Sequence, residues 1–156
     1  MNPQENQLFV FAYREQLSLE ANRRLTGEIS VFLSQWNSHG KSLHATALTM
    51  ENRFLIIETS GSQPGGCSKD TLFRSLDEIN RYLNLSLIKP SSFFLEINGE
   101  PCPISRKELQ DGLRSGTISP ETILFPTWIS SAAEFAALWK KPLRFFPFLF
   151  PEKDLV

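Results

Sequence analysis

Two short apolar runs constrain this chain more than any other feature of its sequence. Residues 8–13 read Leu-Phe-Val-Phe-Ala-Tyr, and residues 53–59 read Arg-Phe-Leu-Ile-Ile-Glu-Thr. A strand formed by either run is apolar on both faces, so it needs cover on both sides. Such strands belong in the middle of a sheet. The chain is therefore expected to build a layered fold around these two segments.

Helical and extended patterns alternate around the two runs. Further strands are predicted over residues 43–50 and 93–97, and helices follow the first and third strands, with Ser18 as the N-cap of the first helix. The buried stripes of the helices are Leu25, Ile29, Phe32, Leu33 and Trp36 in the first, and Leu72, Leu76, Ile79 and Leu83 in the second. The order β-α-β-β-α-β predicts an α+β, ferredoxin-like core with an antiparallel sheet over residues 1–97.

The remaining residues, 98–156, are predicted to form a C-terminal β/α extension packed on this core as part of one compact unit. Asn98-Gly99 is typical of a hairpin turn. Capping boxes at Ser105–Glu108 and Ser131–Glu134 predict two short helices. Residues 123–125 read as a short strand.

The composition of the chain indicates which kinds of partner and which cellular compartment to expect. The net charge is −1 over 156 residues, so the basic excess of a nucleic-acid binder is missing. No run approaches the roughly 20 apolar residues of a membrane span, and the polar start lacks a signal-peptide pattern. We therefore expect a cytoplasmic protein with neither nucleic-acid nor membrane partners. Two cysteines and two histidines without close spacing predict no metal site, and no cofactor is expected.

The loop from Gly61 to Asp70 is the first candidate for chemistry. It follows an apolar strand and opens a helix, where free backbone N–H groups attract anions. Its sequence is close to the phosphate-binding loop motif Gly-x4-Gly-Lys-Ser/Thr, but Cys67 occupies the position of the lysine. This difference argues against ATP hydrolysis. Gly65, Gly66, Cys67 and Ser68 remain candidates for binding a phosphate or another anion. The alternative is an ordinary connection with a helix cap.

Cys67 is a second candidate, because a helix N-terminus favours the thiolate. With His39 or His44 as a base and Asp70 beside it, Cys67 would serve a cysteine-dependent enzyme or redox protein. The alternative is a packing cysteine. His39 in that case closes the first helix.

The tail from Leu143 to Pro151 is rich in aromatic side chains that must be hidden or shared. Pro147 and Pro151 exclude a regular helix or central strand. One interpretation is an arm packed on the sheet. The other is a docking segment for a protein partner or for a homodimer, with four candidate contact residues: Phe145, Phe146, Phe148 and Phe150.

Two resemblances accompany these patterns. At Trp36-x-x-His39-Gly40 and Gly66-Cys67-Ser68-x-Asp70 the chain resembles a family of small uncharacterised bacterial proteins, often labelled ABC transporter ATPases. The residues do not support that label, since the phosphate-loop lysine and the ABC signature are missing. Residues 98–139 are similar to GYF-type adaptor modules, without the aromatic cluster that grips a proline-rich peptide.

No complete catalytic set emerges from the sequence. The leading hypothesis is therefore a non-catalytic binding or interaction protein. The cysteine-dependent enzyme and the anion-binding protein that does not hydrolyse its ligand remain the alternatives.

Overall fold

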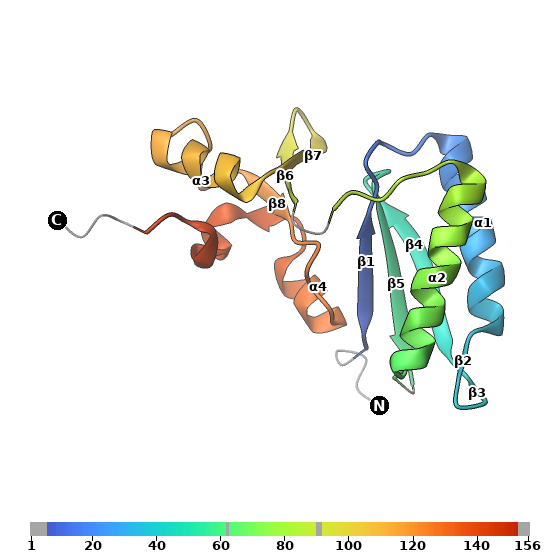
Figure 1. The fold of residues 1–156 in the computed structure, drawn as a ribbon. Helices are drawn as coiled ribbons and strands as arrows, with labels where there is room; N and C mark the ends of the chain where they lie inside the picture. The colour runs from blue at the N-terminus through green and yellow to red at the C-terminus, as the bar shows by residue number, and fades with distance from the viewer. Residues whose placement is uncertain (1–5, 62, 90–91, 153–156) are drawn as a thin grey trace. The chain divides into compact units, whose positions relative to one another are not determined.

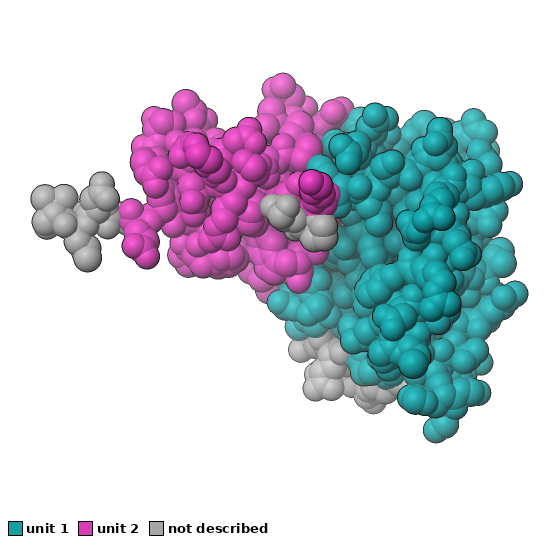
Figure 2. Space-filling model, in the orientation of Figure 1, with its two compact units in different colours: residues 1–88, 129–135 teal, residues 89–128, 136–156 magenta. Residues whose placement is uncertain are grey.

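The computed structural model describes residues 6–61, 63–89 and 92–152. Helices and antiparallel sheets make it an α+β protein, and the chain forms two compact units (Figures 1 and 2). Unit 1 contains Met1–Ile88 and Ile129–Phe135, and unit 2 contains Lys89–Trp128 and Ala136–Val156. The expected boundary after residue 97 falls inside a hairpin of unit 2. Ser62 of the candidate anion loop and the first five residues lie outside the described chain.

Unit 1 is built on a three-stranded antiparallel sheet. Its strands are β1 (Leu8–Ala12), β4 (His44–Met50) and β5 (Phe54–Ser60), in the order β1-β5-β4. The apolar β5 is central, as its sequence predicts. The outer edge of β1 is partly occupied, because Ile88 N donates to Ala12 O over 2.9 Å and Leu8 N donates to Ser130 O over 3.0 Å. The prediction of a central strand is therefore wrong for β1, which ends the strand order, although these backbone bonds occupy part of its outer edge.

Helices α1 (Leu19–Gln35) and α2 (Gly66–Leu83) cover one face of this sheet (Figure 1). Ser18 caps α1 as predicted, since its Oγ accepts a hydrogen bond from Ala21 N over 3.0 Å. α2 ends at Asn84, which adopts a left-handed conformation with φ 60°. Between helices and sheet lies an apolar core that includes the fully buried side chains Leu25, Ile29, Leu55, Ile57 and Leu72.

One polar pair is buried in this core. Tyr13 is wholly buried and its Oη donates a hydrogen bond to Asn80 Oδ1 over 2.8 Å. Burial raises the pKa of the Tyr13 phenol well above its ordinary value of 10.0, because the phenolate would lose its hydration, and the bond to Asn80 opposes this rise in part. The folded protein therefore holds Tyr13 protonated.

This pair predicts a loss of stability at alkaline pH. The unfolded chain ionises Tyr13 near pH 10.0 and the folded chain does not, so the stabilisation present below that pH is lost as pH rises above it. The free energy of unfolding is expected to fall by up to about 1.4 kcal/mol per pH unit from this group. Urea unfolding of the native protein and of Tyr13→Phe above and below pH 10.0 measures the difference. Tyr82→Phe, at a 70% exposed residue, is the control, and equal pH slopes in all three proteins would contradict the prediction.

The expected ferredoxin-like sheet is not formed by the described residues. Strand β6 (Phe93–Ile97) pairs with β7 (Glu100–Ile104) and β8 (Ile123–Phe125), and β8 pairs with β9 (Lys141–Pro142), in a second sheet of order β7-β6-β8-β9. The Asn98-Gly99 turn, with φ 54° and 80°, closes a local hairpin that pairs β6 forward along the chain. Residues 86–88 lie at the end of β1 instead, where Leu87 bridges to Tyr13. The prediction of α+β structure is confirmed, and the four-stranded arrangement is wrong.

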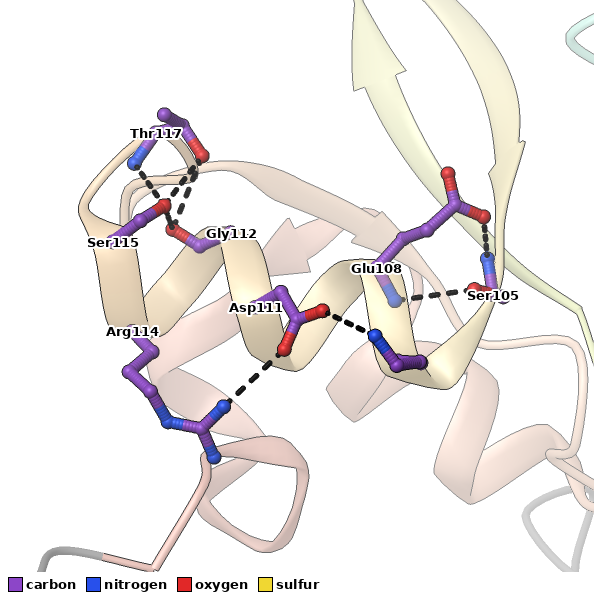
Figure 3. A network of polar contacts seen from close by, with 8 residues as sticks. Ser105, Glu108, Asp111, Gly112, Arg114, Ser115 and Thr117 are labelled. Carbon is purple, nitrogen blue, oxygen red and sulfur yellow. Dashed lines mark hydrogen bonds and ion pairs between the residues drawn. The ribbon is translucent and has the colours of Figure 1, made fainter.

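Unit 2 adds one complete α-helix and part of another to this second sheet. α3 (Arg106–Ser115) opens with the predicted capping box between Ser105 and Glu108 and ends at Gly116 (Figure 3). α4 spans Ala132–Leu138, so its first four residues belong to unit 1 and its last three to unit 2. Along α3, Asp111 accepts from Lys107 over 3.0 Å and from Arg114 over 3.2 Å. These surface pairs contribute little to stability.

The tail folds as two 3₁₀ turns, η2 (Leu143–Phe145) and η3 (Pro147–Leu149). A 3₁₀ turn has about three residues per turn, so positions three apart share a face. Leu143, Phe146 and Leu149 accordingly enter the core of unit 2 beside Leu95, Leu109 and Leu124. The tail is thus a structural part of unit 2.

Candidate functional site

A small hairpin brings the two sequence motifs of unit 1 together. Strands β2 (Asn37–Ser38) and β3 (Lys41–Ser42) flank a turn of His39 and Gly40, with φ 53° and 78°. Two positive φ values suit the twist of a two-residue hairpin, and glycine adopts one without strain. His39 therefore lies in this turn and does not close α1, which ends at Gln35.

The hairpin is fastened to the start of α2 by buried groups. Trp36 Nε1 donates to Ser68 O over 2.9 Å, and Ser68 Oγ donates to Asn37 O over 2.9 Å. Gly65 N donates to Ser38 Oγ over 3.3 Å. Trp36, Ser38 and Ser68 are all buried. Residues of the motifs at 36–40 and 66–70 therefore have a structural role, because they hold the hairpin against the start of α2.

His39 lies over the N-cap of α2. A Cβ at Gly65 would stand 3.5 Å from His39 Nε2 and 3.6 Å from Ser38 Oγ, so this glycine sits closely under the hairpin turn. Gly65 is the N-cap without a side-chain bond, and the helix begins at Gly66. The four residues predicted to bind an anion, Gly65, Gly66, Cys67 and Ser68, thus form the cap and first turn of α2. The structure places an imidazole beside them.

Cys67, His44 and Asp70 are not brought into one constellation. Cys67 and Asp70 are exposed on α2, and within the described chain no hydrogen bond joins the Cys67 side chain to either imidazole. His44 begins β4 and lines a pocket of about 690 Å³ that Cys67 and His39 do not line. A nucleophile needs a base within hydrogen-bond reach. This geometry supports the cysteine-dependent hypothesis less than the sequence does.

Unit 2 carries a cluster of aromatic rings that we call the aromatic surface: Phe93, Trp128, Phe146 and Phe148. The Trp128 ring meets the rings of Phe93, Phe146 and Phe148 edge-on, at centroid distances of 5.9, 5.7 and 5.8 Å. Phe146 is buried, whereas Trp128 is 41% and Phe148 59% exposed. Edge-to-face packing holds such rings in fixed orientations. The aromatic surface is therefore a rigid, partly solvent-facing apolar patch.

The four tail phenylalanines predicted to contact a partner have different positions. Phe146 is core, Phe150 is half-buried against the core of unit 2, and Phe145 and Phe148 face solvent. Arg144 lies 4.7 Å over the Phe145 ring and also pairs with Glu121 over 2.9 Å. Phe145 is thus already covered by a cation. Phe148 is the tail residue with the most accessible ring.

Trp128 is the functional candidate that sequence reasoning missed. It stands alone after Pro126-Thr127, outside any periodic apolar pattern, so nothing in its neighbourhood marks it as part of a cluster. Its residue type is the signal that could have identified it, because tryptophan is enriched among the contact residues of protein interfaces.

The described chain lacks the features of a metal site and of a membrane span. It has no group of three or more His, Cys, Asp or Glu side chains able to hold a metal ion. Its helices are all too short or too polar to cross a lipid bilayer. Comparison with family models, with curated proteins and with solved structures found no match to this chain.

Proposed function

We propose that this protein is a non-catalytic interaction protein that holds an extended apolar segment of a partner protein against the aromatic surface of unit 2. The observation that carries the proposal is the exposed Trp128–Phe148 pair, fixed by Phe93 and the buried Phe146. Aromatic rings that are rigid before binding lose little conformational entropy on contact.

The chemistry of this surface favours a proline-containing or aliphatic extended peptide. Exposed aromatic rings offer apolar faces on which proline rings or aliphatic side chains pack. An extended polyproline-type segment is already ordered in solution, so its binding costs little entropy. None of the four residues of the aromatic surface is charged, which agrees with an apolar contact.

Trp128 provides its own test. It is 41% exposed, whereas Trp36 and Trp139 are 3% and 8% exposed, so acrylamide quenching of tryptophan fluorescence reports mainly on Trp128. Peptides selected from a displayed library against the native protein are expected to protect this fluorescence. Trp128→Ala and Phe148→Ala are each expected to raise the dissociation constant of the peptide at least about tenfold. This corresponds to a loss of about 1.4 kcal/mol of binding free energy for each contact residue removed.

The matched control is Phe73→Ala in unit 1. Phe73 is 46% exposed and also packs edge-on, against Phe9 and Phe11, so the change removes a comparable ring that is not part of the aromatic surface. It should leave peptide affinity unchanged. If the selection yields only peptides whose binding survives both Trp128→Ala and Phe148→Ala, the aromatic surface is not the binding site.

We further propose a cytoplasmic location. Cys67 is exposed and Cys102 half-buried, and both are free thiols, a state that a reducing compartment maintains. Cysteine-dependent chemistry and anion binding at α2 rank behind the interaction role. The exposed Cys67 has no hydrogen bond to a base among the described residues, and the hydroxyls of Ser38 and Ser68 are used to fasten the hairpin.

A further inference from the structure

Strand β4 leaves a row of backbone groups unused at the edge of the unit 1 sheet. Thr59 N donates to Gln7 O, so the odd-numbered residues of β5 face β1 and the even-numbered ones face β4. By the alternation of an antiparallel ladder, Ala45, Ala47 and Thr49 then point their N–H and C=O groups away from β5. Within the described chain these outward groups have no hydrogen-bond partner. The edge is therefore ready to accept another strand.

The usual protections of an edge strand are missing from β4. Its sequence, His-Ala-Thr-Ala-Leu-Thr-Met, contains no proline, lysine or acidic residue. All seven residues pair consecutively with β5, so no bulge twists the edge away. Proteins that remain monomeric commonly protect their edges by such means. An unprotected edge of seven residues is a suitable place for another strand to pair.

The space beside this edge is also open. A pocket of about 690 Å³ lies between α1 and β4, lined by Ser30, Leu33 and Ser34 of the helix and by Ala45 and Ala47 of the strand. A Cβ at Gly27 would meet nothing within 4 Å, and Val31 on the same stretch of α1 is 60% exposed. Small side chains on both walls leave room for a neighbouring strand and helix at short distance.

We propose that β4 pairs antiparallel with β4 of a second copy of this chain, about a two-fold axis through Ala47. In this register Ala47 faces Ala47 of the second copy, and the two residues exchange both of their N–H···O bonds. Ala45 then faces Thr49, and Thr46 faces Leu48. The two three-stranded sheets become one continuous six-stranded sheet.

Two observations select a second copy as the occupant. β4 contains no Lys, Arg, Asp or Glu, so antiparallel self-pairing sets no like charges opposite one another. Leu48 is 50% exposed on the face away from the helices, and the two Leu48 side chains would lie diagonally across the axis. Self-pairing thus covers an exposed leucine and brings no like charges together.

Sedimentation velocity over a concentration series tests the proposal. The native protein is expected to sediment as a dimer at micromolar concentrations. Leu48→Glu places two like charges across the axis and is expected to raise the dimer dissociation constant at least about tenfold. Adding Thr46→Lys to Leu48→Glu sets the introduced ammonium group opposite the introduced carboxylate of the second copy and is expected to restore the dimer. This recovery specifies the register.

Ala47→Pro provides an independent variant. The proline removes an N–H that β5 does not use, so the intrachain ladder stays intact while both central bonds of the dimer are lost. The dissociation constant should rise by roughly a hundredfold. Circular dichroism and thermal unfolding verify that each variant folds, and Leu48→Glu, at an exposed position, serves if Ala47→Pro does not fold.

A monomer at every concentration would overturn this proposal, as would a dimer unaffected by Leu48→Glu or a monomer whose β4 edge binds only foreign peptides. Phe148→Ala is the control that separates the two interfaces. It should weaken peptide binding at the aromatic surface and leave the dimer intact. Loss of the dimer in Phe148→Ala alone would assign dimerisation to the aromatic surface and refute pairing through β4.

Discussion

Replacing Phe146 by alanine is expected to lower the free energy of unfolding by about 3–5 kcal/mol. The Phe146 side chain is 1% exposed and packs in the core of unit 2 with Leu143 and Leu149. Its removal leaves a cavity that the surrounding 3₁₀ turns cannot fill without losing their own contacts. It also withdraws the ring that supports Trp128 from below, at a centroid distance of 5.7 Å. Urea unfolding followed by tryptophan fluorescence and by circular dichroism measures the loss.

The neighbouring Phe145→Ala is the matched control. Phe145 is 47% exposed, and its described contact is the Arg144 guanidinium over its ring. Its removal is expected to cost less than about 1 kcal/mol. Similar losses in the two variants would show that the three-residue spacing of buried side chains in the tail does not hold in solution.

The second large effect is expected at Gly112, in the interior of α3. A Cβ there would stand 2.4 Å from Ile118 Cδ1 and 2.6 Å from Ile118 Cγ1, well inside van der Waals contact. Ile118 cannot move away freely, because its backbone N donates to Gly112 O over 2.9 Å. Gly112→Ala is therefore expected to destabilise the protein by about 1–3 kcal/mol, despite the better helix propensity of alanine.

Gly27→Ala in α1 measures the gain from the helix propensity of alanine without this steric clash. Gly27 is also inside a helix, but a Cβ there meets nothing within 4 Å. That variant is expected to gain about 0.5–1 kcal/mol. Opposite signs for the two glycines in urea unfolding would support the steric account, and equal gains would refute it.

The parts of this fold that the sequence predicts are those set by local pattern. The Ser18 cap, the capping box at Ser105–Glu108 and the Asn98-Gly99 turn each depend on residues a few positions apart. The buried stripes of α1 and α2 follow the helical period. Such features need no knowledge of what the rest of the chain does.

The distribution of strands between sheets could not be predicted in the same way. β6 has the apolar pattern of a strand that could have joined either sheet. The competition is decided by entropy, since pairing with β7 closes a short turn, whereas pairing with β1 closes a loop of most of unit 1. The edge of β1 is met instead by Ser130 and Ile88, which carry no strand pattern. The order of predicted strands and helices along the chain therefore suggested a four-stranded sheet, which the described residues do not form.

The candidate sites show the same limit. Joining His39 to Gly65 requires the short hairpin of residues 37–42, whose residues are polar and weakly patterned. The aromatic surface requires Phe93, Trp128 and Phe148, which are separated by long stretches of chain and meet only through the sheet of unit 2. The sequence identified the aromatic tail as a place of interest. It could not show which rings of the tail are buried.

Residues Ile129–Phe135 belong to unit 1, so unit 1 is completed only late in synthesis on the ribosome. Leu8 leaves the ribosome long before its partner Ser130, which is synthesised only after residues 89–128 of unit 2. Until then this part of the outer edge of β1 is unpaired in the nascent chain, and an unpaired strand edge promotes aggregation with neighbouring nascent chains. A gene truncated after Ile88 would leave the product in that unfinished state permanently.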